Sequence, residues 1–396
     1  MKTTVYMDNA ATTKLTPGAL AAMMPYLTDN FGNPNSIYSH GATALRAVNE
    51  ARKILAGVIN VKPNEIYFTA GGTEADNWAI KATMEAYAKE GGHIITSTTE
   101  HHAVLHTCEY MEKKGHAVTY VPVDEQGIIR LDELEKAIRA DTVLISVCFA
   151  NNEIGSIQPI REIGRLARSK GILFHTDAVQ AFCHLPIDAE EYCIDMLSAS
   201  AHKLGGPKGV GFLYIRSGLK LGSFIHGGAQ ERGRRAGTGN VPAIVGFGAA
   251  AAKAVTNMAE KQEKVAALRD YLIERIGAEI PHCRLNGDAT RRLPGNVNFS
   301  FRFIEGEGLL ISLDMKGIAA SSGSACTSGS LDPSHVLLAI GLPHEIAHGS
   351  LRLSLCEENT REEADFVVST LKEIVARLRD MSPLYEDMLK TMNEKP

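Results

Sequence analysis

The sequence predicts an α/β fold with a large domain on a mainly parallel sheet and a smaller α+β domain. Between about residue 60 and residue 216, short β-rich apolar runs alternate with segments of helical periodicity, which is typical of a parallel sheet covered by helices. The last third of the chain mixes strand-like runs with amphipathic helices. With 396 residues and 44% hydrophobic content, the chain is long enough to bury a large core.

The large domain is predicted from apolar runs of strand length. We expect strands at 66–70, 93–97, 117–123, 142–150, 172–176, 195–200 and 210–215. Segments between them carry apolar residues at three- and four-residue spacing and end near glycine, as helices do. The expected result is a mainly parallel, seven-stranded sheet with helices on its faces.

The smaller domain is predicted from the rest of the chain. A long helical pattern follows Pro242 and continues to about Gly277, and we expect this helix to bridge the two domains. After it come the strand-like runs NVNFSFRF, IAASS and SLRLSL and the helix-like runs GEGLLISLDMKG and TREEADFVVSTLKEIVARLRD. The predicted division assigns residues 16–259 to the large domain and residues 1–15 and 260–396 to the small one.

Charge and hydropathy exclude several classes of protein. The 41 basic and 46 acidic residues give a net charge of −5, so no basic field for direct nucleic-acid binding is expected. The apolar run 245–252 is far shorter than the roughly 20 residues of a membrane span. Residues 1–18 lack the patterns of secretory and transit peptides, so we expect a cytoplasmic protein without a membrane role.

The seven cysteines are scattered without paired spacing, so we expect free thiols in a reducing compartment and no intrinsic metal site. One of them, Cys326, lies in the segment 319–330, which is too small and polar to form core. We therefore expect an exposed, reactive thiol there. An exposed thiol without function is the alternative.

A glycine turn, Ala70–Glu74, follows the first expected strand and opens a helix. Small residues let the backbone approach a ligand closely, and the free N–H groups and dipole of a helix start attract an anion. This pattern predicts a phosphate site at Gly72 and Thr73. An ordinary turn in which Thr73 caps the helix is the alternative.

Asp177 follows an apolar strand, at the edge of an open α/β sheet where ligands bind. A buried carboxylate there needs a cationic partner, and a protonated pyridine nitrogen would supply one. The alternative is an aspartate that caps the next segment.

The loop 198–209 places Lys203 among small residues between two expected strands. A partly desolvated lysine has a lowered pKa and forms Schiff bases, and Ser200 and His202 beside it can donate to a phosphate. A solvated lysine is the alternative for this residue taken alone.

Many spaced motifs in one order give the chain an end-to-end resemblance to the cysteine desulfurases of the NifS/IscS group, in the class V aminotransferase family. They are YMDNAATT, GNP, AGGTEADN, TEHHAV, NNEIGSIQPI, HTDAVQ, SASAHKLGGPKG, ERGRRAGTGN, SSGSACTSGS and SLRLSL. The resemblance implies the aminotransferase-like fold of type I pyridoxal 5′-phosphate (PLP) enzymes and a homodimer. It also implies conversion of L-cysteine to L-alanine with a protein persulfide, whose sulfur serves iron–sulfur cluster assembly and other sulfur transfer through a scaffold of the IscU or NifU kind.

The resemblance also implies roles for single residues. Lys203 matches the Schiff-base lysine, Cys326 the persulfide cysteine, and His101 the imidazole that stacks on the ring, with His102 as its competitor. The implied cofactor-binding residues are His101, Lys203, Gly72, Thr73, Asn152, Asp177, Gln180, Ser200, His202 and, from the second subunit, Thr238. The implied substrate-binding residues are Asn33, Asn152 and Arg352, whose guanidinium forks onto the carboxylate. The one metal role is transient, with Cys326 as an iron–sulfur ligand beside a scaffold protein.

Two other functions stay open. One is a selenocysteine lyase or related β-lyase on the same fold, against which the motif SSGSACTSGS argues. The other is a protein that mainly organises iron–sulfur assembly, against which the combination of Lys203, Asp177 and Cys326 argues. Housekeeping and nitrogen-fixation roles are not separated by the sequence.

Overall fold

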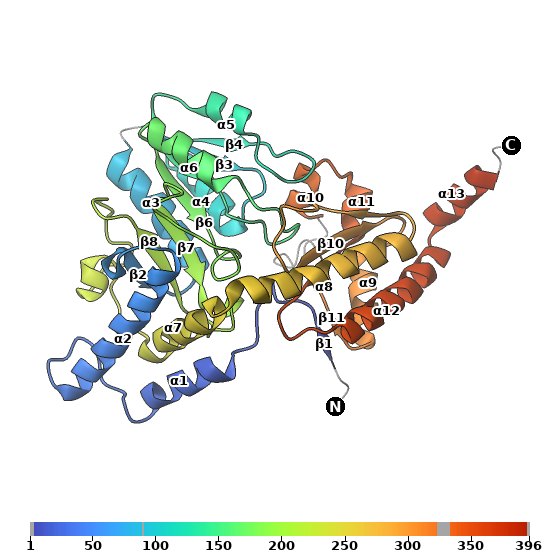
Figure 1. Cartoon of the computed structure of the whole chain (residues 1–396). Helices are drawn as coiled ribbons and strands as arrows, with labels where there is room; N and C mark the ends of the chain where they lie inside the picture. Colours follow the sequence, from blue (N-terminus) through green and yellow to red (C-terminus); the bar gives the residue numbers. More distant parts are fainter. Residues whose placement is uncertain (1–3, 89–90, 323–332, 394–396) are drawn as a thin grey trace.

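The structure is a computed structural model that describes residues 4–88, 91–322 and 333–393 (Figure 1). Its larger sheet has seven strands in the order β2-β8-β7-β6-β5-β3-β4, which confirms the predicted α/β fold. Only β8 runs antiparallel to its neighbours, while the other pairs are parallel. The strands are β2 (Ile66–Thr69), β3 (His93–Ser97), β4 (Ala117–Val121), β5 (Thr142–Ser146), β6 (Leu173–Asp177), β7 (Met196–Ser200) and β8 (Gly211–Ile215).

Helices cover this sheet, as Figure 1 shows. They are α3 (Gly72–Tyr87), α4 (His102–Lys113), α5 (Leu131–Ala137) and α6 (Ile160–Ser169). A further layer consists of α1 (Pro17–Leu27), α2 (Ser39–Val58) and α7 (Val241–Val255), and α7 packs on both of the others. Short 3₁₀ helices are η1 (Pro63–Glu65), η2 (Ala201–Lys203) and η3 (Gln230–Gly233). The buried apolar side chains of these layers form two cores, a large one that includes α2 and α7 and a smaller one that includes α3 and α4.

The expectation of one long helix after Pro242 is wrong. The segment forms two helices, α7 and α8 (Met258–Glu279), bent by 75° relative to each other. Asn257 between them adopts a left-handed conformation with φ of 54°, which asparagine tolerates better than most residues and which ends a right-handed helix. In the described part of the chain no single helix is long and apolar enough to span a membrane, and α7 and α8 meet that test only as a bent pair.

A second body of structure surrounds α8, which crosses the centre of Figure 1. It contains the antiparallel sheet β12-β10-β9 and the parallel pair β1-β11, packed against α8, α9 and α12 around a separate apolar core. The elements are β1 (Val5–Tyr6), β9 (Cys283–Leu285), β10 (Asn296–Phe301), α9 (Gly306–Met315), β11 (Ile318–Ala319), α10 (His335–Ala339), α11 (His344–His348), β12 (Ser350–Ser354), α12 (Arg361–Asp380) and α13 (Pro383–Asn393). The predicted domain boundaries, 16–259 for the large domain and 1–15 with 260–396 for the small one, stay a prediction.

Candidate active site

The start of α3 lies against the carboxyl ends of β6 and β7. A Cβ atom on Gly72 would come within 2.5 Å of Val179 Cγ2, so only glycine lets the helix begin so close to the segment after β6. A Cβ on Gly71 would lie 3.8 Å from Ser200 Oγ, at the end of β7. The residue that caps α3 is Gly71 rather than Thr73, and no side chain caps the helix. The alternative in which Thr73 caps it is therefore wrong, and the helix start retains the N–H donors that an anion needs.

Asp177 is the last residue of β6 and is only 8% exposed. One of its oxygens, Oδ1, accepts a hydrogen bond from Val179 N at 2.9 Å. Burial raises the pKa of Asp177 above its ordinary value, and nearby His101 and Lys203 partly oppose that rise. A cationic partner would therefore stabilise the ionised carboxylate.

His101, rather than His102, lies beside Asp177. One ring nitrogen of His101 and one carboxylate oxygen of Asp177 are within 4.8 Å of each other. His101 also caps α4, since its Nδ1 accepts from Ala103 N at 3.1 Å. The ring of His102 instead packs on His106 and His335, with centroids 5.0 and 4.8 Å away. This geometry favours His101 for the stacking role that the sequence implies.

Lys203 ends η2, just beyond β7. Its Nζ donates to the carbonyl oxygens of Ala10 at 2.6 Å and Ala11 at 2.8 Å. Gln180 Nε2 donates to the same Ala10 oxygen at 3.0 Å, so the N-terminal segment joins two of the predicted cofactor residues. Burial, with the charges of two lysines, lowers the pKa of His202 to about 4, which leaves this imidazole neutral at pH 7.

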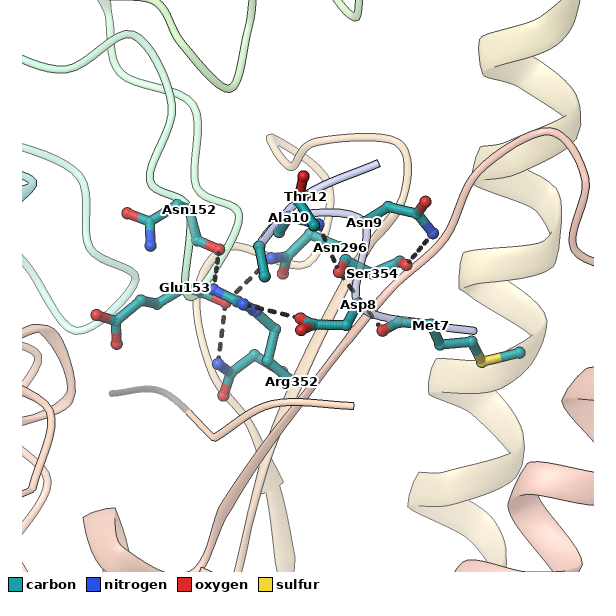
Figure 2. A network of polar contacts seen from close by, with 12 residues as sticks. Met7, Asp8, Asn9, Ala10, Thr12, Asn152, Glu153, Asn296, Arg352 and Ser354 are labelled. Carbon is teal, nitrogen blue, oxygen red and sulfur yellow. Dashed lines mark hydrogen bonds and ion pairs between the residues drawn. The ribbon is translucent and has the colours of Figure 1, made fainter. Parts of the chain in front are cut away.

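Arg352 and Asn152 meet on the other side of the site (Figure 2). The side chain of Arg352 is 2% exposed, in the middle of β12. Its Nη1 donates to the carbonyl oxygen of Asn152 at 3.1 Å, and its Nη2 forms an ion pair with Asp8 Oδ1 at 3.0 Å. The guanidinium therefore lies between the two predicted domains. It forms an ion pair with a carboxylate of the protein itself, that of Asp8.

The predicted residues Asn33 and Thr238 are exposed. A Cβ on Gly239 would be 3.8 Å from Pro34 Cγ, so the two loops are neighbours. Among the described residues, neither Asn33 nor Thr238 has a hydrogen bond to another member of the predicted set. The role of Thr238 toward a second subunit and the role of Asn33 toward the substrate both stay predictions.

Cys326 lies outside the described residues, so its role stays a prediction. Burial disfavours a reactive thiolate in five of the six cysteines that the structure describes, and Cys193 is the exception. Cys108, Cys148 and Cys183 are buried, and burial raises the pKa of each thiol. Burial also raises the pKa of Cys356, which disfavours the reactive thiolate.

Sequence reasoning missed three carboxylates of the site. Asp8 pairs with Arg352, and Glu153 accepts a hydrogen bond from the Ser334 hydroxyl, while burial raises the pKa of Glu153 to about 7. Asp76 lies within 4.8 Å of Asp177, and burial and the charge of Asp177 hold its pKa well above its ordinary value. A signal for Asp76 was present, since an acidic residue stands on the apolar face of α3.

The arrangement fits PLP. The uncapped start of α3 suits a phosphate, with Ser200 close by. Within the described residues the carboxylate of Asp177 accepts only the hydrogen bond from Val179, which leaves an oxygen for a protonated ring nitrogen. Lys203 supplies the amine that an aldehyde needs.

Comparisons with known proteins agree with this chemistry. A family model described as aminotransferase class-V matches residues 5–367. The cysteine desulfurase IscS of Clostridium botulinum (strain Hall) is 56% identical over 397 residues, covering 100% of both chains. Among solved structures, a NifS-like protein is 40% identical with a TM-score of 0.89, covering 95% of this chain and 100% of that one. The structure of SspA in complex with cysteine is also 40% identical, with a TM-score of 0.81, covering 90% and 100% of the two chains.

Proposed function

The chain belongs to the class-V aminotransferase family and is a PLP-dependent cysteine desulfurase, and we propose that Lys203, Asp177, Arg352 and Cys326 carry the reaction. The observation that supports this most is the convergence of Asp177, His101 and the uncapped start of α3 beside Lys203. These groups come from different elements of the sheet edge. Their convergence matches one cofactor with a phosphate, a ring nitrogen and an aldehyde.

When bound, PLP supplies an electron sink for the charge that develops at the substrate α-carbon. Asp177 would hold the protonated ring nitrogen, and His101 would lie against the ring. Arg352 binds the carboxylate of cysteine beside Asn152. Lys203 Nζ would hold the cofactor, and the same amine would accept the α-proton of the substrate.

In this proposal, Cys326 carries out the sulfur transfer. Its thiolate forms a bond to the substrate sulfur as the carbon–sulfur bond of the substrate breaks, and the electron pair of that bond stays with the carbon fragment. Protonation of the fragment yields alanine, and the sulfur remains as a persulfide on Cys326. A scaffold protein of the IscU or NifU kind is the proposed acceptor, and a cytoplasmic location stays a prediction.

A homodimer is part of the proposal, with Thr238 directed to the phosphate of the second subunit. Large apolar side chains are exposed on the face around α1 and the loop that follows it: Leu20, Met24, Leu27, Phe31, Ile37 and Tyr38. A patch of this kind is typical of an interface. Because Gly239 lies next to Pro34 in that loop, Thr238 stands at the edge of the patch.

The function is tested on the purified holoenzyme with L-cysteine and a thiol reductant. We expect one alanine for each sulfide released, without any partner protein. Selenocysteine is the control substrate, and mass spectrometry after cysteine loading reports the persulfide. Efficient selenocysteine turnover without a persulfide would support the lyase alternative instead, and an absence of alanine would support an organising role.

Replacing Asp177 by asparagine is expected to lower turnover by about 10²–10³-fold, as loss of one electrostatic partner at a reacting centre does. The cofactor should stay bound, since Lys203 and the phosphate site are unchanged. Alanine formation and the absorption spectrum are the measurements. The exposed Asp141, which precedes β5 at the opposite edge of the sheet, provides the control variant Asp141→Asn. Normal turnover in Asp177→Asn would contradict the assigned role.

A further inference from the structure

Asp8 forms an ion pair with Arg352, the residue whose guanidinium the proposed function assigns to the substrate carboxylate (Figure 2). The distance between Arg352 Nη2 and Asp8 Oδ1 is 3.0 Å, and the two side chains are 2% and 17% exposed. Asp8 lies in the segment between β1 and α1, 344 residues before Arg352. The contact is therefore a tertiary one between the N-terminal segment and β12.

The donors of Arg352 show how much of its charge is compensated. Its Nη1 bonds the carbonyl oxygen of Asn152 at 3.1 Å. Its Nε is buried and has no hydrogen-bond partner in the described part of the chain. Among the described residues, Asp8 is the one carboxylate that forms an ion pair with Arg352. Since an isolated charge is costly to bury, Asp8 is the paired carboxylate that compensates the buried guanidinium before substrate binds, and the charge of Arg352 also acts on the buried carboxyl of Glu153.

Hydrogen bonds to Ser354 hold the segment on both sides of Asp8, in addition to the ion pair. Ser354, two residues beyond Arg352 on the same strand, donates its N–H to Met7 O at 2.7 Å and accepts from Asn9 N at 3.2 Å. Its hydroxyl accepts from Ala10 N at 2.8 Å, and Asn9 Nδ2 donates to its carbonyl at 2.8 Å. These bonds bracket Asp8 on both sides. We therefore expect the segment to keep its path when the carboxylate is replaced by an amide.

The same segment also contacts the second cation of the site. Ala10 and Ala11, directly after Asn9, present their carbonyl oxygens to Lys203 Nζ at 2.6 and 2.8 Å. Residues 8–11 thus contact both the amine and the guanidinium that the proposed function gives to the substrate and cofactor. Residues 8–11 would therefore lose a contact when Lys203 or Arg352 binds a different partner.

We propose that Asp8 is the resident counter-ion of Arg352, which the carboxylate of incoming cysteine displaces. The inference rests on the proposed role of Arg352. A ligand with a carboxylate replaces the Asp8–Arg352 ion pair with an ion pair of its own. Its binding free energy is therefore reduced by the free energy of the pair that it breaks. A ligand without a carboxylate leaves the resident pair intact and gains nothing from Arg352. Asp8 therefore lowers the affinity for every carboxylate ligand.

The test uses holoenzyme and two amines without a thiol, L-alanine and ethylamine, which differ by the carboxylate alone. Binding is followed through the cofactor absorption. In Asp8→Asn the Kd of L-alanine is expected to fall about five- to tenfold, the equivalent of one partly exposed ion pair, while the Kd of ethylamine stays the same. The KM of L-cysteine should fall by the same factor with kcat unchanged, because ground state and transition state share the carboxylate.

An unchanged or higher Kd of L-alanine in Asp8→Asn would overturn the inference and make Asp8 an orienting residue instead. Asp8→Ser, a second variant without the charge, must change the Kd in the same direction as Asp8→Asn. Asp141→Asn is the matched control, because it makes the same change at an exposed carboxylate before β5, and its Kd should equal that of the parent. Arg352→Gln separates the two claims, since retained L-alanine affinity there would refute the carboxylate site itself.

Discussion

Replacement of Lys203 by alanine is expected to abolish desulfurase activity, by at least about 10³-fold, because one amine both holds the cofactor and moves the α-proton. The absorption band of the lysine-bound cofactor should disappear as well. PLP would still reach the start of α3 and Asp177, but without a covalent bond, so gel filtration should remove it. The Ala10 and Ala11 carbonyls lose their donor, although Gln180 still contacts Ala10.

The matched control is Lys208→Ala. Lys208 lies in the same glycine-rich loop but is exposed, so its removal should leave both the absorption band and the turnover intact. Borohydride treatment followed by peptide mapping identifies the modified lysine directly. A bleachable band that survives in Lys203→Ala, or that maps to Lys208, would contradict the assignment.

Replacement of Cys326 by alanine is expected to separate cofactor chemistry from sulfur transfer. The cofactor spectrum should be normal and should still respond to L-cysteine, because Lys203 and Asp177 are unchanged. Steady-state alanine formation should fall by at least about 10³-fold, as it does when a nucleophile is removed, and no persulfide should form. Mass spectrometry of the cysteine-loaded protein measures the persulfide, and amino-acid analysis measures the alanine.

The control thiol is Cys193, which is partly exposed and lies in the loop before β7. Cys193→Ala should keep both the persulfide and the alanine. Buried Cys148 and Cys183 are poor substitutes for Cys326, because burial raises the pKa of both thiols. Normal alanine formation by Cys326→Ala would remove this residue from the reaction and revive the lyase alternative.

Much of the site was predictable because its residues stand at the ends of strands. Asp177 follows an apolar run and Lys203 follows another, and parallel strands bring such ends to one edge of a sheet. The choice between His101 and His102 was not predictable in this way, since both adjoin the start of α4. Packing of His102 on His106 and His335 separates them, and His335 is more than 200 residues away in sequence.

The sequence alone determined the seven strands and the glycine turn before α3, because alternating apolar runs and turn residues act locally. It also supplied the family motifs on which the assignments of Lys203 and Cys326 rest. Only the tertiary structure decided that the helix after Pro242 breaks at Asn257 and that Asp8 pairs with Arg352. The break depends on a left-handed backbone at one residue, which a helical pattern of apolar residues does not record. The ion pair depends on a contact between distant segments and on removal of charges from water, and neither quantity is contained in a local pattern.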